Sequence, residues 1–259
     1  MKDSQLFADI KQILIDSLRS KFAKYNPEPR YMPFHTRLLG KDRMALYSFI
    51  QSLNTNFGTS IYEPVAVRIG KSRFETSEKQ QTAGTKISSE AQTVIQNIMD
   101  DLSAADIAPN KISEIERIRK VCQKGQMNTV KLTKVDLKLQ SASGDIYLID
   151  IKTAKPNAGA YREFKRTMLE WTAAMLADDP NAKIHTLIAI PYNPEHPKKY
   201  DRWTILGMLE IDQELLVAEG FWDFLGGKGC YEQLLDVFEE VGVELRDEID
   251  EYFAKYVGG

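Results

Sequence analysis

The chain has 259 residues, 43% of them hydrophobic and 27% charged, which is the composition of a globular protein with a sizeable core. Its formal net charge of −3 argues against a wholly basic nucleic-acid binder. Asp3, Asp9 and Asp16 interrupt the apolar residues at the N-terminus, which argues against a signal peptide or membrane span, and we expect a cytoplasmic protein with no membrane partner.

The first third of the chain is expected to be mostly helical. Apolar residues from Leu6 to Phe22 recur with the 3.6-residue period of an amphipathic helix. Helices are expected over 4–24, 42–53 and 59–69, with an irregular connection at 26–34. Residues 73–89 are polar and aperiodic, which predicts an exposed loop.

The hydrophobic period changes from helical to alternating in the middle of the chain. Val135, Leu137 and Leu139 alternate with polar residues, the turn residues 141–144 follow, and residues 145–154 alternate again, which predicts a β-hairpin. Helices are expected at 88–103, 111–123, 158–177, 213–225 and 230–256, and further strands at 183–190 and 203–209. This order predicts an α/β sandwich around a mixed central β-sheet flanked by helices.

The predicted hairpin brings together the residues with the clearest chemistry. A turn centred near Ser143 places Asp136 across from Asp150, with Cβ atoms roughly 4.5–5.5 Å apart, and Lys152 projects from the same face. Two adjacent carboxylates repel unless a cation lies between them, and Mg²⁺ prefers such oxygen ligands. Lys152 would then contact the attacking water or the scissile phosphate. We therefore predict a divalent-metal site for phosphodiester hydrolysis.

The same spacing also occurs by chance on solvated hairpin faces. Here, however, the Asp150-Ile151-Lys152 run closes an apolar strand that contains Ile146, Leu148 and Ile149. A carboxylate and an ammonium beside such a strand are costly to bury without a partner or a function. The placement therefore favours the metal site over a solvated face.

The run V-D-L-K-L…Y-L-I-D-I-K-T-A-K-P-N resembles the PD-(D/E)xK nuclease signature, with Val135 in place of the usual proline. Segments 32–66 and 149–171 further resemble type II restriction endonucleases of the group that cuts GGNCC, and this resemblance covers most of the chain. It implies one restriction-endonuclease-like domain over 1–259. Its parts are a helical N-terminal part (1–57), a nuclease core (58–210) and acidic C-terminal helices (211–259).

The resemblance also implies a chemistry and partners. It implies a Mg²⁺-dependent enzyme, with Mn²⁺ as a substitute, that cuts double-stranded DNA as a homodimer beside a cognate methyltransferase. Asp136 and Asp150 would bind the metal together with the carbonyl of Ile151, and Lys152 would be the catalytic lysine. An additional helix acid is expected in this superfamily, with Glu63 as the first candidate and Glu114 as the second; each is otherwise a solvated or ion-paired glutamate.

The distribution of charge suggests where DNA would bind. Residues 1–200 contain 30 Lys and Arg against 22 Asp and Glu, a balance of +8, whereas residues 201–259 contain 4 against 15, a balance of −11. Phosphate contacts are expected from a cationic helix stripe, and base contacts from a basic loop. The stripe is Lys155, Arg162, Lys165 and Arg166, and the loop cluster is Lys198, Lys199 and Arg202 with Trp203. Segments 54–56 and 79–86 are alternatives for base contacts, and a plain solvent-facing surface is the alternative for both clusters.

Two other functions remain compatible with the hairpin. One is a PD-(D/E)xK repair or recombination nuclease, although the chain offers neither the Gln-x-x-x-Tyr helix nor the helicase segment often found there. The other is a non-catalytic DNA-binding module, although all three key residues are intact. A zinc or thiol enzyme is not indicated, because Cys122 and Cys230 are isolated and the three histidines lack zinc-ligand spacing.

Overall fold

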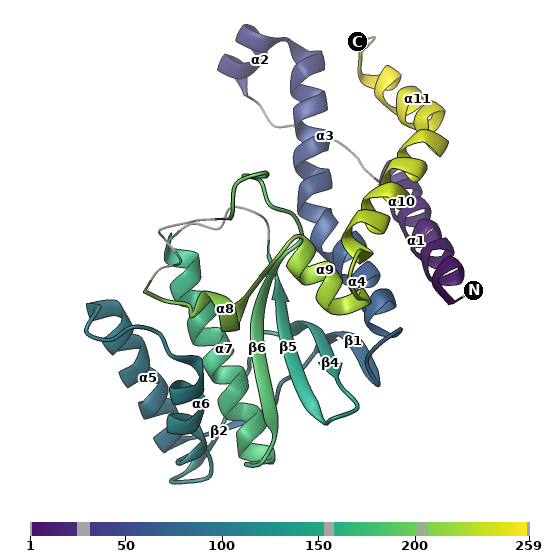
Figure 1. Ribbon diagram of the computed structural model, residues 1–259. Coiled ribbons are helices and arrows are strands. Elements are labelled where there is room, and N and C mark those ends of the chain that lie inside the picture. Colours follow the sequence, from purple (N-terminus) through teal and green to yellow (C-terminus); the bar gives the residue numbers. More distant parts are fainter. Residues whose placement is uncertain (1, 25–31, 153–157, 201–204, 206, 258–259) are drawn as a thin grey trace. The chain divides into compact units, whose positions relative to one another are not determined.

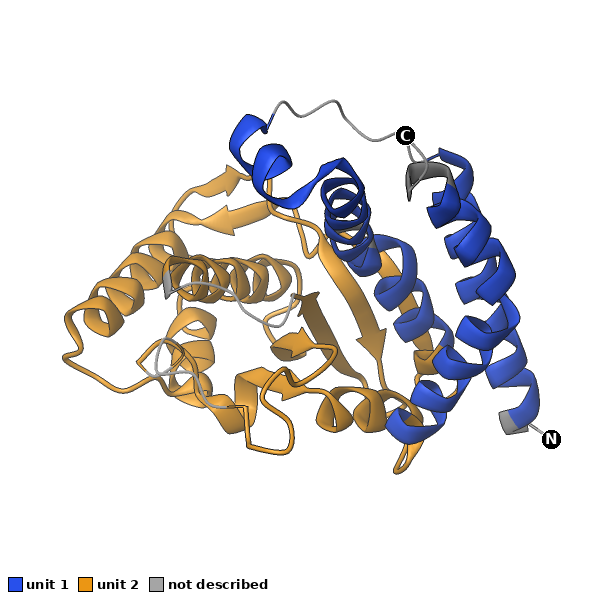
Figure 2. Cartoon of the chain, turned by 90° about the horizontal axis from the view of Figure 1, so that it is seen from above, with its two compact units in different colours: residues 1–68, 231–259 blue, residues 69–230 orange. Residues whose placement is uncertain are grey.

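The structure, a computed structural model, describes residues 2–24, 32–152, 158–200, 205 and 207–257. The chain forms two compact units, one of residues 1–68 and 231–259 and the other of residues 69–230, coloured separately in Figure 2. Both unit boundaries fall inside the parts 58–210 and 211–259 expected from the sequence. No helix in the described part of the chain is long and apolar enough to cross a membrane.

The first unit is helical, as predicted for both ends of the chain. Its helices are α1 (Lys2–Lys24), α2 (Pro33–Leu39), α3 (Lys41–Phe57), the π-helix η1 (Gly58–Tyr62), most of α4 (Glu63–Gly70), α10 (Cys230–Glu244) and α11 (Arg246–Val257). The ends of the chain are joined by the ion pair between Arg19 and Glu248 and by the stacking of Phe22 on Tyr252, with ring centroids 4.8 Å apart. The helix expected at 42–53 extends to Phe57, and that expected at 230–256 is two helices.

The second unit contains the mixed sheet that the sequence predicts. The strands are β1 (Thr76–Gln81), β4 (Val135–Gln140), β5 (Asp145–Ile151), β6 (Lys183–Ile190) and β7 (Leu215–Val217), in the order β1-β4-β5-β6-β7 (Figure 1). Strands β1, β4 and β5 pair antiparallel, whereas β5, β6 and β7 pair parallel. A separate two-stranded sheet joins β2 (Lys86–Ser88) to β3 (Met127–Thr129).

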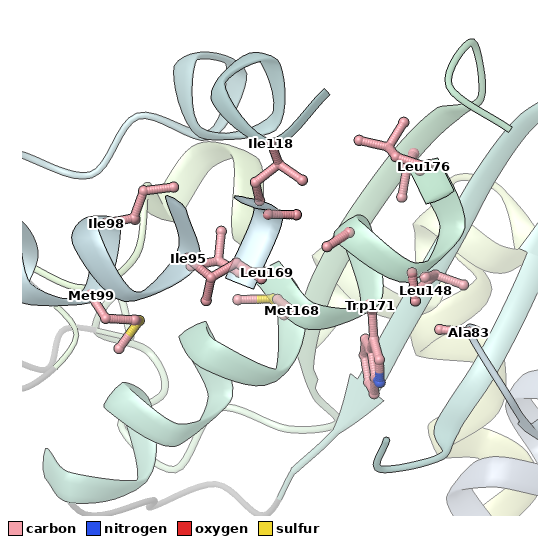
Figure 3. Packing of buried hydrophobic residues seen from close by; sticks show 14 of the residues in the cluster. Ala83, Ile95, Ile98, Met99, Ile118, Leu148, Met168, Leu169, Trp171 and Leu176 are labelled. Carbon is pink, nitrogen blue, oxygen red and sulfur yellow. The ribbon is translucent and has the colours of Figure 1, made fainter. Parts of the chain in front are cut away.

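Helices cover one face of this sheet. Helix α7 (Ala158–Asp178) packs on β6, and α5 (Ser89–Ala104) and α6 (Lys111–Arg119) pack on α7 (Figure 1). Ile95 and Ile98 of α5 join Met168 and Leu169 of α7 and Leu148 of β5 in a buried hydrophobic cluster (Figure 3). On the other face, Tyr147 of β5 packs on Phe224 of α9 (Glu219–Gly226). Burial on both faces explains the apolar character of β5 and β6.

Four sequence predictions are wrong in this unit. The loop expected at 73–89 contains β1 and β2, because β1 lies at the sheet edge, where its backbone pairs with β4 while half of its polar side chains remain exposed. The strand expected at 203–209 is absent at the described residues, where Ile205 and 207–208 form turns. Strand β7 pairs with the edge of β6 instead. It follows α8 (Ile211–Glu214) and so interrupts the helix expected at 213–225. Helix α6 ends at Arg119 rather than near residue 123.

Candidate functional site

The hairpin of β4 and β5 has the predicted register but ends early. Its ladder runs from Gln140 opposite Ile146 to Leu137 opposite Ile149 and stops one pair short of Asp136 and Asp150. The backbone N–H of Ile151 donates instead to Asp136 Oδ2 at 2.9 Å. The two aspartates are therefore brought together by a side-chain contact and not by the direct backbone pairing that the sequence predicts.

Asp150 is a buried carboxylate beside an ammonium group. Only 6% of its side chain is exposed, and Lys152 Nζ lies 2.7 Å from its Oδ1. Lys152 is thus the cation that contacts this carboxylate in an ion pair. Lys152 Nζ also lies 5.2 Å from the centroid of the Phe164 ring, and this cation–π contact stabilises the ammonium group.

The surroundings shift the proton equilibrium of Asp150. Burial raises the pKa of Asp150 from 3.8 to about 7, although the charge of Lys152 and its contact lower it in part. The neighbouring carboxylate of Asp136 contributes to this raised pKa, through its charge and through a hydrogen bond with the protonated form. Two carboxylates in this arrangement share a site that favours either a proton or another cation.

The donor set fits a hard divalent cation. Asp136 and Asp150 supply two neighbouring carboxylates, whose repulsion the single ammonium of Lys152 balances only in part and a divalent cation would relieve. Among the described residues, no group of three or more His, Cys, Asp or Glu side chains forms a complete cage. The other ligand positions would fall to backbone, water or substrate oxygens, which Mg²⁺ ordinarily accepts.

All of these groups lie at one edge of the sheet. Strands β5 and β6 are parallel, so Lys152, whose N–H donates to Ala189 O at 2.9 Å, and the segment after β6 leave from the same edge. Strand β4 runs antiparallel to β5 and therefore begins there, with Asp136 as its second residue. Lys198 and Lys199 are exposed in the segment after β6, as predicted, whereas Lys155 and Arg202 lie outside the described residues.

The predicted cationic stripe on α7 is wrong for Lys165. This side chain is fully buried, and its Nζ lies 2.6 Å from Glu114 Oε2 and 2.8 Å from Glu214 Oε2. Lys111 completes the cluster with an ion pair to Glu214 at 3.0 Å and a hydrogen bond to Thr186. The cluster offers no exposed ammonium for a phosphate, and it shows Glu114 as an ion-paired residue, the alternative role considered from the sequence.

Arg162 and Arg166 face α5. They donate to Ser103 Oγ at 3.0 Å and Gln96 Oε1 at 2.8 Å. A helix turns by about 100° per residue, so Phe164, whose ring contacts Lys152, lies roughly 160–200° around α7 from these arginines. The two arginines are therefore on the opposite side of α7 from the residue that contacts Lys152.

Glu63 is buried in the first turn of α4 and belongs to the other unit, so its role at the site stays a prediction.

The site includes one residue that the sequence does not indicate. Gln80 of β1 donates from Nε2 to Asp136 Oδ1 at 3.1 Å. From the sequence, the segment 79–86 is expected to make base contacts only. The contact depends on the pairing of β1 with β4 across 56 residues of sequence, and neither the polar composition nor the spacing of β1 signals it.

Comparison with known proteins decides the family. The profile described as "Type II restriction endonuclease, HinfI" matches residues 3–242. The chain belongs to this family. Relatives include the type II restriction enzyme MjaII of Methanocaldococcus jannaschii, which is 28% identical over an alignment of 265 residues. This alignment covers 90% of this chain and 70% of the relative. HgiCII of Herpetosiphon aurantiacus is 25% identical over 227 residues, covering 84% and 80%, and HgiBI of the same organism is 22% identical over 240 residues, covering 91% and 85%.

The chain is thus a type II restriction enzyme, a site-specific deoxyribonuclease of a restriction-modification system that acts on DNA. Family membership confirms the nuclease function expected from the hairpin and displaces the repair-nuclease and non-catalytic alternatives. Restriction endonucleases of this kind are typically Mg²⁺-dependent. The acids and the lysine at the sheet edge supply the groups that this chemistry needs.

The raised pKa of Asp150 leads us to expect that Mg²⁺ binding by this restriction enzyme depends on pH. The pKa of this carboxyl group is about 7 in the folded protein and 3.8 in the unfolded chain. Its protonation therefore stabilises the metal-free protein at low pH, and this stabilisation is lost as the pH rises toward 7. A cation needs the ionised group, so we expect Mg²⁺ affinity to rise about tenfold from pH 6 to pH 8. Calorimetric titration at both pH values measures it, and equal affinities would contradict the prediction.

Proposed function

We propose that Asp136, Asp150 and Lys152 form the phosphodiester-hydrolysing centre of this restriction enzyme, with Mg²⁺ as its cofactor and Mn²⁺ as a substitute. The observation that carries the proposal is the buried Asp150 carboxylate, which contacts both the Asp136 carboxylate and the Lys152 ammonium at one sheet edge, so that two acids face a single ammonium. Such an arrangement is costly in a protein unless a cation completes it.

The residues of the chain have distinct tasks in this proposal. Asp136 and Asp150 would hold the cation, with the carbonyl of Ile151 as the further predicted ligand. The bound ion would offset charge on the phosphate oxygens and make a water molecule easier to deprotonate. Lys152, whose side chain is 30% exposed, is the ammonium that reaches solvent at the site. It would offset the negative charge that grows on the scissile phosphate, and Phe164 would hold it in place.

DNA would approach the sheet edge at which β5 and β6 end. The exposed Lys198 and Lys199 leave the sheet from this edge, which supports phosphate contacts there. Lys155 and Arg202, named from the sequence, belong to the same proposal. Arg162 and Arg166 carry less weight in it because their side chains bond to α5. Glu63 is proposed as the additional acid.

The target and the assembly are further parts of the proposal. GGNCC is the proposed site, on the resemblance of segments 32–66 and 149–171 to enzymes that cut it. Such a site is nearly palindromic, so two copies of the chain related by two-fold symmetry would present one centre to each strand. A cognate methyltransferase would protect the host's own sites.

Digestion of plasmid DNA tests the function and the target together. The purified protein is incubated with unmethylated plasmid and Mg²⁺, with EDTA as one control and the Lys152→Ala variant as another. We expect discrete fragments whose ends map to GGNCC, and no fragments in either control. Discrete fragments that map elsewhere would overturn the GGNCC target alone. Cleavage that persists in Lys152→Ala would overturn the assignment of the centre.

A further inference from the structure

Gln80 stands level with Asp136 on the neighbouring strand. In the pairing of β1 with β4, Lys79 is opposite Leu137 and Gln81 is opposite Val135, so Gln80 lies between these two pairs. Its Nε2 donates to Asp136 Oδ1 at 3.1 Å. An ionised carboxylate only accepts hydrogen bonds, so the nitrogen end of the carboxamide is the end that faces Asp136.

The backbone at Gln80 has an uncommon conformation for a strand residue. Its φ is +57°, in the left-handed region that favours glycine. A residue with a side chain persists in such a conformation where the surrounding structure imposes it, and these residues cluster at functional sites. Gln80 combines this backbone with a half-buried side chain that reaches the carboxylate of a proposed metal ligand.

The Asp136 carboxylate accepts hydrogen bonds from both neighbouring strands. Gln80 donates to its Oδ1, while the N–H of Ile151 donates to its Oδ2. Each oxygen keeps lone pairs beyond the one that accepts its hydrogen bond, so the two donors orient the carboxylate without occupying all of its acceptor positions. One donor comes from each neighbouring strand, which fixes the rotation of the carboxylate relative to Asp150.

We propose that Gln80 is a positioning residue, which holds the Asp136 carboxylate in the orientation that binds the catalytic cation. The inference rests on the proposed role of Asp136 as a metal ligand. Donors that orient ligand side chains contribute strongly to metal sites, and their loss typically lowers metal affinity or activity by about 10- to 100-fold. Gln80 would act on cleavage through Asp136 and would not itself contact the DNA.

Two substitutions separate the hydrogen bond from the backbone conformation. Gln80→Met keeps the length of the side chain and the unfavourable φ but removes the donor. Gln80→Gly removes the donor and also suits the positive φ. We expect both variants to bind Mg²⁺ about 10- to 100-fold more weakly in calorimetric titration of the DNA-free protein. In digestion assays kcat should fall by a similar factor, while KM for DNA stays unchanged.

Thermal unfolding of the metal-free protein gives the second readout. Gln80→Gly should unfold at a temperature equal to or above that of the wild type, whereas Gln80→Met should not gain stability. Ala105→Gly is the matched control, because Ala105 has a φ of +59° at the end of α5. This control should gain stability in the same way. It should leave Mg²⁺ affinity and kcat unchanged, because it does not touch Asp136.

The outcomes separate this inference from the proposed function. If the Gln80→Met variant has the same Mg²⁺ affinity and kcat as the wild type, the proposed role of Gln80 is wrong, and the proposed centre is unaffected. A raised KM for DNA with unchanged Mg²⁺ affinity would make Gln80 a DNA contact, which also overturns it. If Asp136→Ala binds Mg²⁺ as well as the wild type does, both the proposed metal site and the role of Gln80 fail.

Discussion

Replacement of Asp150 by asparagine is expected to abolish Mg²⁺-dependent cleavage while making the metal-free protein more stable at pH 8. Loss of the ligand removes several kcal/mol of cation-derived stabilisation of the transition state, which corresponds to at least about a thousandfold in rate. Stability should rise because the variant removes the carboxylate charge that is buried at position 150. The difference between a pKa of 3.8 and about 7 sets a ceiling of roughly 4 kcal/mol on the gain.

Asp145→Asn is the matched control on the same strand. Asp145 is at the start of β5, where hydrogen bonds from Ser143 and His185 lower its pKa to about 2. An acid with a lowered pKa stabilises the folded protein at pH 8, so its replacement should reduce stability and leave cleavage unchanged. Digestion assays and thermal unfolding measure both variants. Full activity in Asp150→Asn, or a loss of stability in that variant at pH 8, would refute the account of this carboxylate.

Replacement of Lys165 by methionine is expected to cause the largest loss of stability. The variant leaves Glu114 and Glu214 buried with only Lys111 to balance them. Breaking a buried ion pair by removing one partner typically costs about 3–5 kcal/mol. Urea unfolding followed by tryptophan fluorescence measures the change, because all three tryptophans lie within residues 69–230.

Two further variants test the cause of that loss. Arg166→Met changes the next residue of α7, whose guanidinium bonds to Gln96 at the surface, and should alter stability by no more than about 0.5 kcal/mol. Adding Glu114→Gln to Lys165→Met restores the balance of charge and should recover part of the lost stability. If the double variant is no more stable than Lys165→Met alone, uncompensated charge is not the cause.

Local patterns were sufficient to predict the hairpin that carries the proposed centre. The alternation around Asp136 and Asp150 and the turn between the strands are properties of neighbouring residues, and they predict the register that the structure confirms from Gln140 to Leu137. The same locality explains the correct prediction of α7 and β6. The predicted ladder pair of Asp136 and Asp150 was wrong because the Asp136 side chain accepts the N–H of Ile151 and ends the ladder.

Contacts between distant segments decided the rest. Lys165 has the sequence spacing of a surface cation, but two glutamates from α6 and α8 surround it, and only the packing of these helices determines that it is buried. Gln80 reaches Asp136 because an edge strand of polar residues pairs with β4. The sequence by itself determined which acids and which lysine share a face, because a period of two residues fixes that. Tertiary structure decided which cations are exposed and what holds Asp136, because both depend on elements that meet only after folding.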